Sequence, residues 1–551
     1  MTSYTLTLLD TTGIQDYIFS SNRLQENIGA SELVYRATSL WAFEALHGIV
    51  GKGKHNILDH TELEWEFSDK CIENGDLDAE IIQAAGGNLL ILFKEHEKAI
   101  EFTQKLTLRV LKDAPGLTLL AQHEEKFDFE KGNLGEAREE LGEKMQAHKL
   151  SRIPSSPLLG LGVTAVGAST GLPAVRSSEG KQDGIELLVG DQKDKEEEKN
   201  RLISRETTFK LAARDWAGKR LKAWLKEDIG DFHFPYDLDK LGRAKGEESY
   251  IAVVHADGNH MGDHVAKATA NIKDNRKWIQ ALRKFSEIIN KASLIALQNV
   301  VSMLTYALMM DEEERIPFAV QDKKDYLPFR PLVFGGDDLT FVCSGKIGIS
   351  LATMYIEEFH EAAKARGLND LFASAGVGMV KMHYPFIRAY KLSEELANSA
   401  KSLNREEGQD CSAIDWHFAQ SGLSGSLKSI REREYTVDDG KLYLRPLKLK
   451  DGEDFRSWDI VKAVIEDFQN KDKNKDEKDR WSHNKVIGLR EPLRKGEKAT
   501  QEYRLNFDLP QLPEIEGGLA RDKGWANGRC YYFDAIELLD HYAPIKEKKE
   551  E

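Results

Sequence analysis

Residues 331–344, with the sequence PLVFGGDDLTFVCS, constrain the fold more than any other stretch. Two short apolar, β-prone runs flank Gly335, Gly336, Asp337 and Asp338, a pattern that predicts a tight β-hairpin with two carboxylates at its tip. Glycine permits positive φ and close approach of another molecule, and adjacent aspartates concentrate negative charge that a hard divalent cation would neutralise. For these four residues alone, a solvated turn between strands is an equally good interpretation.

A second stretch supplies a third carboxylate. An apolar strand pattern, YIAVVHAD, ends at Asp257 and is followed by Gly258 and Asn259. Such a glycine-containing loop can expose backbone groups to a metal and to phosphates. If the strand ends lie side by side, Asp257 would join Asp337 and Asp338 in binding one or two Mg²⁺ or Mn²⁺ ions, which prefer carboxylate oxygens. We therefore expect metal-assisted phosphate chemistry, with an attacking hydroxyl activated and a triphosphate neutralised.

Two further features fall on the segments after this hairpin. Lys401 lies in a helical pattern over residues 384–404, where it would add a cationic phosphate contact. A solvated helix lysine is the alternative. Gly376 and Gly378 lie in a strand pattern and are not a credible dinucleotide fingerprint, so close packing is the preferred interpretation.

The N-terminal region contains a weaker copy of the same pattern. A strand pattern ends at Asp10, and a glycine-tipped hairpin follows at residues 84–93. From residue 10 to residue 88 is 78 positions, and from 257 to 337 is 80, which suggests duplication of a ferredoxin-like unit. We align Asn88 with Asp337 and Leu89 with Asp338, so the first copy lacks the paired carboxylates. It is expected to be catalytically dead and to shape the nucleotide pocket.

The 551 residues exceed what one hydrophobic core supports. The fold class predicted is α+β, with two ferredoxin-like domains, a helical linker and an α-helical C-terminal domain. We expect the degenerate first domain over residues 1–185, the charged linker over 186–247, the second domain over 248–425 and the helical domain over 426–551. Within the first domain, residues 20–28 are polar and predict a loop, and a helix is expected from Gly29 with Ser31 as a candidate N-cap.

Composition narrows the function classes. A formal net charge of −15 argues against general coating of nucleic acid, so any RNA contact should be local or shared with partner proteins. The four cysteines are scattered, which supports neither a disulfide framework nor a zinc knuckle. No apolar run approaches the roughly 20 residues of a membrane span, and no basic segment precedes the first strand. We expect a cytoplasmic protein without membrane contact.

With these motifs in place, the sequence resembles the large palm-polymerase subunit of type III CRISPR effector complexes, a family with two nucleotide cyclase-like palm domains and a GGDD motif in the second. Four segments carry the resemblance over roughly residues 1–430, in matching order and spacing: residues 13–31 with Gly29-Ala30-Ser31, residues 256–262, residues 333–340, and residues 374–377 followed by Ala400-Lys401.

The resemblance implies conversion of ATP into cyclic or linear oligoadenylates that act as second messengers in antiviral defence, with other NTPs left open as substrates. Asp257 matches the family's first metal-ligating aspartate, Asp337 and Asp338 its GGDD pair, and Lys401 its phosphate-contacting lysine. Gly258, Asn259, Gly335 and Gly336 would line the nucleotide. The family often has Asp where this chain has Asn259, which would weaken one metal contact. No histidine is followed by aspartate, so a compact form without an HD nuclease is expected.

Two other functions stay open. A non-catalytic scaffold would hold guide or target RNA and other effector-complex subunits without turning over ATP. A cyclase that uses GTP to make a dinucleotide would have the same carboxylates, because the carboxylates do not choose the base. The duplicated unit makes that second alternative weaker.

Overall fold

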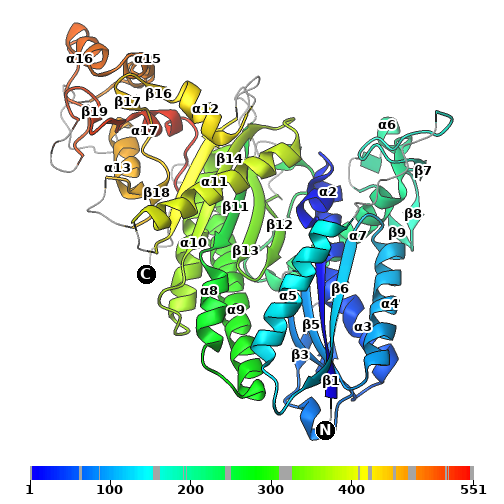
Figure 1. Ribbon diagram of the computed structural model, residues 1–551. Coiled ribbons are helices and arrows are strands. Elements are labelled where there is room, and N and C mark those ends of the chain that lie inside the picture. The colour runs from blue at the N-terminus through cyan, green and yellow to red at the C-terminus, as the bar shows by residue number, and fades with distance from the viewer. Residues whose placement is uncertain are drawn as a thin grey trace. The chain divides into compact units, whose positions relative to one another are not determined.

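Figure 1 shows the computed structural model. It describes residues 3–60, 65–85, 87–152, 162–189, 192–193, 195–241, 250–309, 326–407, 410–419, 425–450, 455–469, 480–515, 518 and 520–545. Unit 1 consists of Met1–Glu227, Tyr236–Leu238 and His260–Lys291, and unit 2 of Asp228–Pro235, Asp239–Asn259 and Ala292–Glu551. The bounds of the four domains expected from the sequence stay predictions.

A four-stranded antiparallel sheet organises unit 1. Its strand order is β4-β5-β1-β6, with bounds β1 Ser3–Thr12, β4 Ala79–Ala85, β5 Asn88–Phe93 and β6 Thr118–Asp128. The first strand thus lies between the third and the fourth, which is the ferredoxin-like arrangement that the sequence predicts.

Helices cover both faces of this sheet, as Figure 1 shows. They are α2 Leu24–Thr38, α3 Leu40–Val50, α4 His96–Asp113 and α5 Leu134–Ser151. Alternate strand residues face opposite sides. On one side Leu6 and Leu92 share a buried cluster with Leu141 of α5, and on the other Phe93 packs against Phe102 of α4.

The predicted loop over residues 20–28 holds for residues 20–23 and is wrong from residue 24 onward, because α2 begins at Leu24. Two of the polar side chains that suggested a loop, those of Gln25 and Glu26, are buried and hydrogen bonded. Glu26 is fully buried and accepts from Arg201 at 2.9 Å, and Gln25 accepts from Arg214 at 2.7 Å. Gly29 lies inside the helix, where an added Cβ would lie 1.6 Å from the Lys210 carbonyl oxygen of α7. Glycine is needed there for close helix packing, so neither Gly29 nor Ser31 starts the helix.

The remaining elements of unit 1 are short apart from one long helix. They are α1 Ile14–Phe19, β2 Ile57–His60, β3 Trp65–Phe67, β7 Ala174–Ser177, β8 Lys181–Gln182, β9 Ile185–Glu186, α6 Glu196–Lys199, β10 Leu202–Ser204, α7 Arg205–Trp224 and α8 Met261–Thr269. The α7 helix is capped by the Ser204 hydroxyl, which accepts from the backbone N–H of Thr207.

A six-stranded sheet organises unit 2, in the order β12-β13-β11-β14-β15-β18. The strands are β11 Tyr250–Gly258, β12 Phe329–Gly335, β13 Asp338–Ser344, β14 Ala373–Lys381, β15 Ala413–Phe418 and β18 Leu447–Lys448. Only the β14–β15 pair is parallel. The first four strands repeat the order found in unit 1, which supports the predicted duplication.

Three long helices accompany the second repeat: α9 Asn275–Met309, α10 Gly348–Lys364 and α11 Phe386–Glu407. The part of α9 up to Lys291 belongs to unit 1 and the rest to unit 2. By length and composition alone, α9 is the one described helix that could cross a membrane, and half of its most apolar stretch is buried inside the protein. Buried core helices share that composition.

Among the described residues after β15, helices outweigh strands, as predicted, although fewer than half of these residues are helical. The helices are α12 Leu427–Glu434, α13 Trp458–Phe468, α14 His483–Gly488, α15 Arg490–Arg494, α16 Glu497–Asn506 and α17 Phe533–Leu538, and the short strands are β16 Thr436–Val437, β17 Gly440–Lys441, β19 Trp525–Ala526 and β20 Arg529–Cys530. A buried polar network ties this region together, because Glu537 accepts from both Arg445 and Tyr435 at 2.6 Å.

Candidate active site

The tip of the β12–β13 hairpin carries Asp337 and Asp338, so the predicted hairpin is confirmed. Gly335 pairs with Asp338 across the strands. Gly336 has a φ of +64°, which glycine adopts without steric cost. A Cβ atom at either glycine would meet no other atom within 4 Å. The space beside the turn is therefore open enough for a ligand to approach the backbone.

Strand β11 places Asp257 at the same edge of the sheet. Its residue Ala256 pairs with Leu339 of β13, which puts Asp257 opposite Asp338. On its other side Asp257 pairs with Ser374 of β14. Register alone therefore brings together the carboxylates of two segments that are far apart in the sequence.

The acids at this edge perturb one another. Burial, followed by the nearby charge of Asp257, raises the pKa of Asp337 to about 7. The Asp337 carboxyl is also hydrogen bonded to that of Asp257. Two carboxylates that share a site resist ionising together. In the protein without a bound cation, Asp337 therefore keeps its proton near neutral pH.

This gives a pH prediction for the metal-free protein. Because the pKa of Asp337 is about 7 when folded and about 3.9 when unfolded, its ionisation opposes folding. Its contribution to stability is thus present below about pH 4 and lost as the pH rises to about 7. We expect the free energy of unfolding, measured with urea and a chelator, to fall over that range more steeply for the wild type than for Asp337→Asn. Equal pH slopes would show that the pKa is not raised.

His255 supports Asp338 from the neighbouring strand. Its Nδ1 lies 3.3 Å from Asp338 Oδ1 and 3.1 Å from Thr340 Oγ1. Burial lowers the pKa of His255, but the Asp338 charge outweighs it, so the pKa lies above 6.5. Asp338 Oδ1 is nevertheless buried without a hydrogen bond. The sequence analysis missed His255, although its position two residues before Asp257 places both side chains on one face of the strand.

Lys401 reaches the carboxylate edge from α11. Its ammonium group donates to Asp257 Oδ2 at 2.5 Å and to the Gly258 carbonyl oxygen at 2.8 Å. Lys401 is therefore no solvated surface lysine. It provides a positive charge inside the carboxylate cluster.

Asn259 is committed to internal hydrogen bonds. It is 1% exposed, its Oδ1 accepts from the Ser374 hydroxyl at 2.9 Å, and its Nδ2 donates to Asp410 Oδ1 and to the Cys411 carbonyl oxygen, both at 3.0 Å. Asn404 Nδ2 donates to the same two acceptors at 3.0 Å. This pair of asparagines fixes the loop after β11 to the start of β15, a structural role that sequence reasoning missed.

The donor set suits a hard divalent ion in its chemistry. Three carboxylates gather at one edge, Asp338 Oδ1 is buried without a hydrogen bond, and Asp257 already binds a cation, the Lys401 ammonium. Among the described residues, however, no three acidic, histidine or cysteine side chains converge as a ready-made metal site. The residues fit a divalent ion, provided that Lys401 gives up its contact with Asp257.

Comparison with known proteins follows this geometry. Residues 250–409, which hold every candidate site residue, match the family model described as Cas10/Cmr2, second palm domain. In this part, the chain is Cas10-like. Its fold is similar to that of the Csm1–Csm4 cassette solved with cA4 and with AMPPNP, each at a TM-score of 0.51, 14% identity, and coverage of 98% of this chain and 69% of that one. Csm1 from T. onnurineus gives the same identity and coverage at a TM-score of 0.50. No curated protein sequence matches.

The first repeat of this Cas10-like chain corrects one detail of the sequence alignment. Asn88 pairs with Asp10 on β1 and closes its hairpin opposite Ala85. Asn88 therefore corresponds to Asp338 and not to Asp337, and the counterpart of Asp337 is Gly87. A Cβ at Gly87 would lie 2.3 Å from Thr11 Oγ1. The alignment was wrong by one residue, but the lack of paired carboxylates in this copy holds.

The first repeat nevertheless keeps the lysine–aspartate pair. Lys149 on α5 lies 2.5 Å from Asp10 Oδ2, as Lys401 on α11 lies 2.5 Å from Asp257. Asp10 and Asp257 occupy the same position, near the end of the first strand of each repeat. Both copies thus have the lysine–aspartate pair, but only the second copy has the paired carboxylates at the hairpin tip. Sequence reasoning missed Lys149, because nothing in its helix marks it apart from other lysines.

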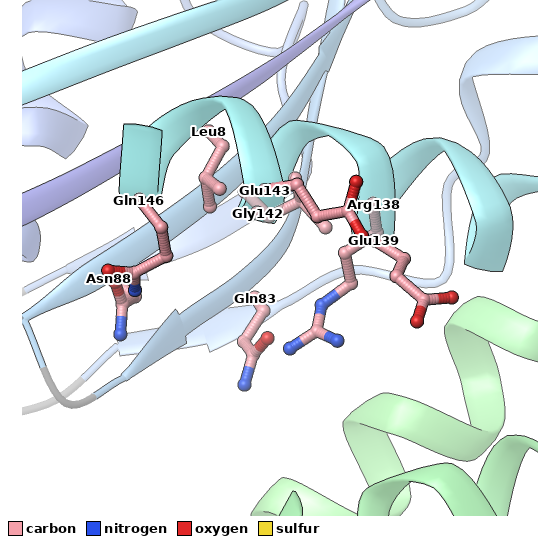
Figure 2. A pocket seen from close by; sticks show the side chains of 9 residues that line it. Leu8, Gln83, Asn88, Arg138, Glu139, Gly142, Glu143 and Gln146 are labelled. Carbon is pink, nitrogen blue, oxygen red and sulfur yellow. The ribbon is translucent and has the colours of Figure 1, made fainter. Parts of the chain in front are cut away.

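A cavity of about 630 Å³ lies beside Asn88 in this Cas10-like chain. It is enclosed by α5 and by the sheet face of β1, β4 and β5. Figure 2 shows the Arg138 guanidinium and the Gln83 amide pointing into it, with Asn88 and Gln146 on one side. Burial lowers the pKa of Arg138. Two carboxylates, those of Glu139 and Glu143, also line the cavity, so the first repeat surrounds it with amides and with charges of both signs.

Proposed function

We propose that the chain is a metal-dependent nucleotidyltransferase of the oligoadenylate synthase or cyclase type, which converts ATP into cyclic or linear oligoadenylate second messengers in type III CRISPR-like antiviral defence. The observation that carries the proposal is the gathering of Asp257, Asp337, Asp338 and Lys401 at one sheet edge of a Cas10/Cmr2-type second palm domain. Similar Csm1-containing structures were solved with AMPPNP and with cA4, which supports the choice of adenine nucleotides.

Each group of site residues would have its own role in this reaction. Asp257, Asp337 and Asp338 would hold one or two Mg²⁺ or Mn²⁺ ions, which supply charge neutralisation for the triphosphate and acidify an attacking ribose hydroxyl. Lys401 would exchange Asp257 for a phosphate oxygen as the nucleotide binds. Gly258, Gly335 and Gly336 would leave room for the triphosphate, and Asn259 would hold the loop that positions Asp257.

We further propose that the protein acts in the cytoplasm as part of an effector complex. Similar chains were solved as Csm1–Csm4 cassettes, which supports another effector subunit as a partner. Guide or target RNA would then reach the protein mainly through shared contacts, as expected for a chain of net charge −15.

The deciding experiment is incubation of the purified chain with each labelled NTP, with Mg²⁺ or Mn²⁺, and with and without candidate RNA, followed by mass analysis. An oligonucleotide product from ATP that disappears on chelation supports the proposal. A dinucleotide product from GTP would favour the alternative cyclase. No product from any NTP, together with co-purified RNA or subunits, would overturn catalysis and favour the scaffold.

Lys401→Met is expected to slow product formation by about 10- to 100-fold, because the phosphate loses its charge-assisted contact. Lys149→Met is the matched control, since it removes the corresponding ion pair of the first repeat. Both variants should lose about 1 kcal/mol or less of folding stability, because the pairs are partly exposed. The two variants are compared by their initial rates of product formation at saturating ATP and metal. Equal rates in the two variants would exclude a catalytic contribution from Lys401.

A further inference from the structure

Unit 2 contains a cavity of about 350 Å³, which lies at the opposite end of α11 from Lys401. It is bounded by α11, by the end of β15 and by α12. Arg388 lies on the first turn of α11, and Lys401 follows 13 residues later, so about 20 Å of helix separates them. The cavity therefore does not belong to the carboxylate site.

The floor of this cavity holds an unsatisfied histidine. His417 of β15 lines it and is 1% exposed, yet both ring nitrogens are buried without a hydrogen-bond partner. Burial, together with the charge of Arg445, lowers its pKa to about 4. The ring is thus neutral at physiological pH and offers one N–H donor and one acceptor nitrogen.

Nearby acids cannot satisfy His417, because they are already engaged. Asp415 accepts two hydrogen bonds from Arg431, at 2.8 and 2.6 Å. Glu537 accepts from Arg445 and Tyr435. A buried polar ring without partners costs free energy, so a bound group that pairs with it would be stabilising.

The walls of the cavity combine apolar surface with positive charge. Leu427 and Ile430 of α12 are buried apolar residues, and Arg388 and Lys391 are exposed cations on the first two turns of α11. In the described part of the chain Arg388 makes no ion pair. Glu395, the one acid among the described residues that line the cavity, accepts from the backbone N–H of Leu427 at 3.0 Å. The N-terminal end of a long helix adds to the attraction for an anion.

We propose that this cavity is a second nucleotide-binding site, which takes a purine nucleotide through its base and its 5′-phosphate. The base would lie against the apolar residues of α12, and one nitrogen of the His417 ring would pair with it, by donating to a ring nitrogen or by accepting from an exocyclic amine. The phosphate would bind Arg388 and Lys391. A volume of about 350 Å³ is at the small end of ligand sites, which suits one nucleotide. The nucleotide is free or is the 5′ end of an RNA or oligoadenylate.

The test uses the full chain carrying Asp337→Asn and Asp338→Asn, with a chelator, so that turnover and metal-dependent binding are removed. Calorimetric titration compares adenosine, AMP and a 5′-phosphorylated RNA. In this background Arg388→Gln should weaken AMP binding at least about tenfold and leave adenosine binding unchanged. Arg433→Gln, at an exposed arginine of α12 outside the cavity, is the control and should change neither.

His417→Leu should weaken both adenosine and AMP, and if that variant does not fold, the surface variant Arg388→Gln still decides the question. Tighter binding of AMP than of the RNA would identify a free nucleotide as the occupant, and the reverse would identify an RNA end. No binding of any of the three, or AMP binding unchanged by Arg388→Gln, would overturn the proposal. Neither outcome depends on whether the chain synthesises oligoadenylates.

Discussion

Replacing Asp337 and Asp338 together by asparagine is expected to reduce oligoadenylate synthesis at least about a thousandfold. The two side chains keep their size and their places at the hairpin tip, but the edge loses two of the three carboxyl groups that would hold a divalent ion. A thousandfold loss corresponds to about 4 kcal/mol of transition-state stabilisation. Mass analysis of products from labelled ATP, at several concentrations of Mg²⁺ and Mn²⁺, measures the effect.

The fold should survive this change. The Asp337 carboxylate opposes folding above its raised pKa of about 7, so Asp337→Asn should be at least as stable as the wild type at pH 8. Asp10→Asn is the matched control, since it alters the corresponding edge of the first repeat, which lacks the paired carboxylates. A double variant that still makes product at the wild-type rate would remove the carboxylates from the mechanism.

Gly376→Ala is expected to destabilise the protein by about 3 kcal/mol or more, since overpacking against rigid backbone is costly. An added Cβ would lie 2.1 Å from the Ser393 carbonyl oxygen and 2.3 Å from the Ala397 nitrogen, both on the backbone of α11. Neither atom can turn away, so α11 must move off the sheet. That helix carries Lys401, so product formation should fall as well.

The chain provides a matched control for this variant two residues away. At Gly378, on the same face of β14, an added Cβ would lie no closer than 3.2 Å to Ala389 O. Gly378→Ala should therefore cost less than about 1 kcal/mol. Urea unfolding of both variants measures the difference. Equal stability of the two would mean that α11 yields more easily than its packing suggests.

The hairpin and the strand before it could be predicted from the sequence because their signals are local. Apolar β-prone runs on both sides of two adjacent glycines predict a hairpin, and the two aspartates that follow the glycines then lie at its tip. The expectation that Gly376 serves packing rather than a ligand is also confirmed by its contact with α11. In both cases a few consecutive residues are enough to make the prediction.

Two predictions were wrong: polar residues were interpreted as a loop, and the two hairpins were aligned by their glycines. Gln25 and Glu26 look like loop residues, yet their partners, Arg214 and Arg201, lie far along the chain and allow them to be buried in α2. Aligning the glycine pairs of the two hairpins placed Asn88 one residue too early, because only strand register shows that it lies opposite Asp10.

The meeting of Asp257 with Asp337 and Asp338 was predicted from their motifs, but ion pairs between distant segments could not be predicted from the sequence. Lys401 is separated from Asp257 by 144 residues, and Glu537 from Arg445 by 92. In the sequence, Lys401 and Glu537 are ordinary charged residues of helical segments, for which solvent exposure is the usual expectation. Only the packing of α11 on β14, and of α17 on its surroundings, turns them into buried or partly buried partners.

The Lys401 ammonium gives the carboxylate edge a counter-charge that is part of the chain itself. The folded state then needs no divalent ion, unlike small domains that fold around a metal. An ion arriving alone must displace the lysine and leave it without a partner, whereas a triphosphate offers the displaced lysine a new one. If the chain binds both as proposed, ion and substrate would therefore strengthen each other's binding by the same factor, which is a reciprocal coupling.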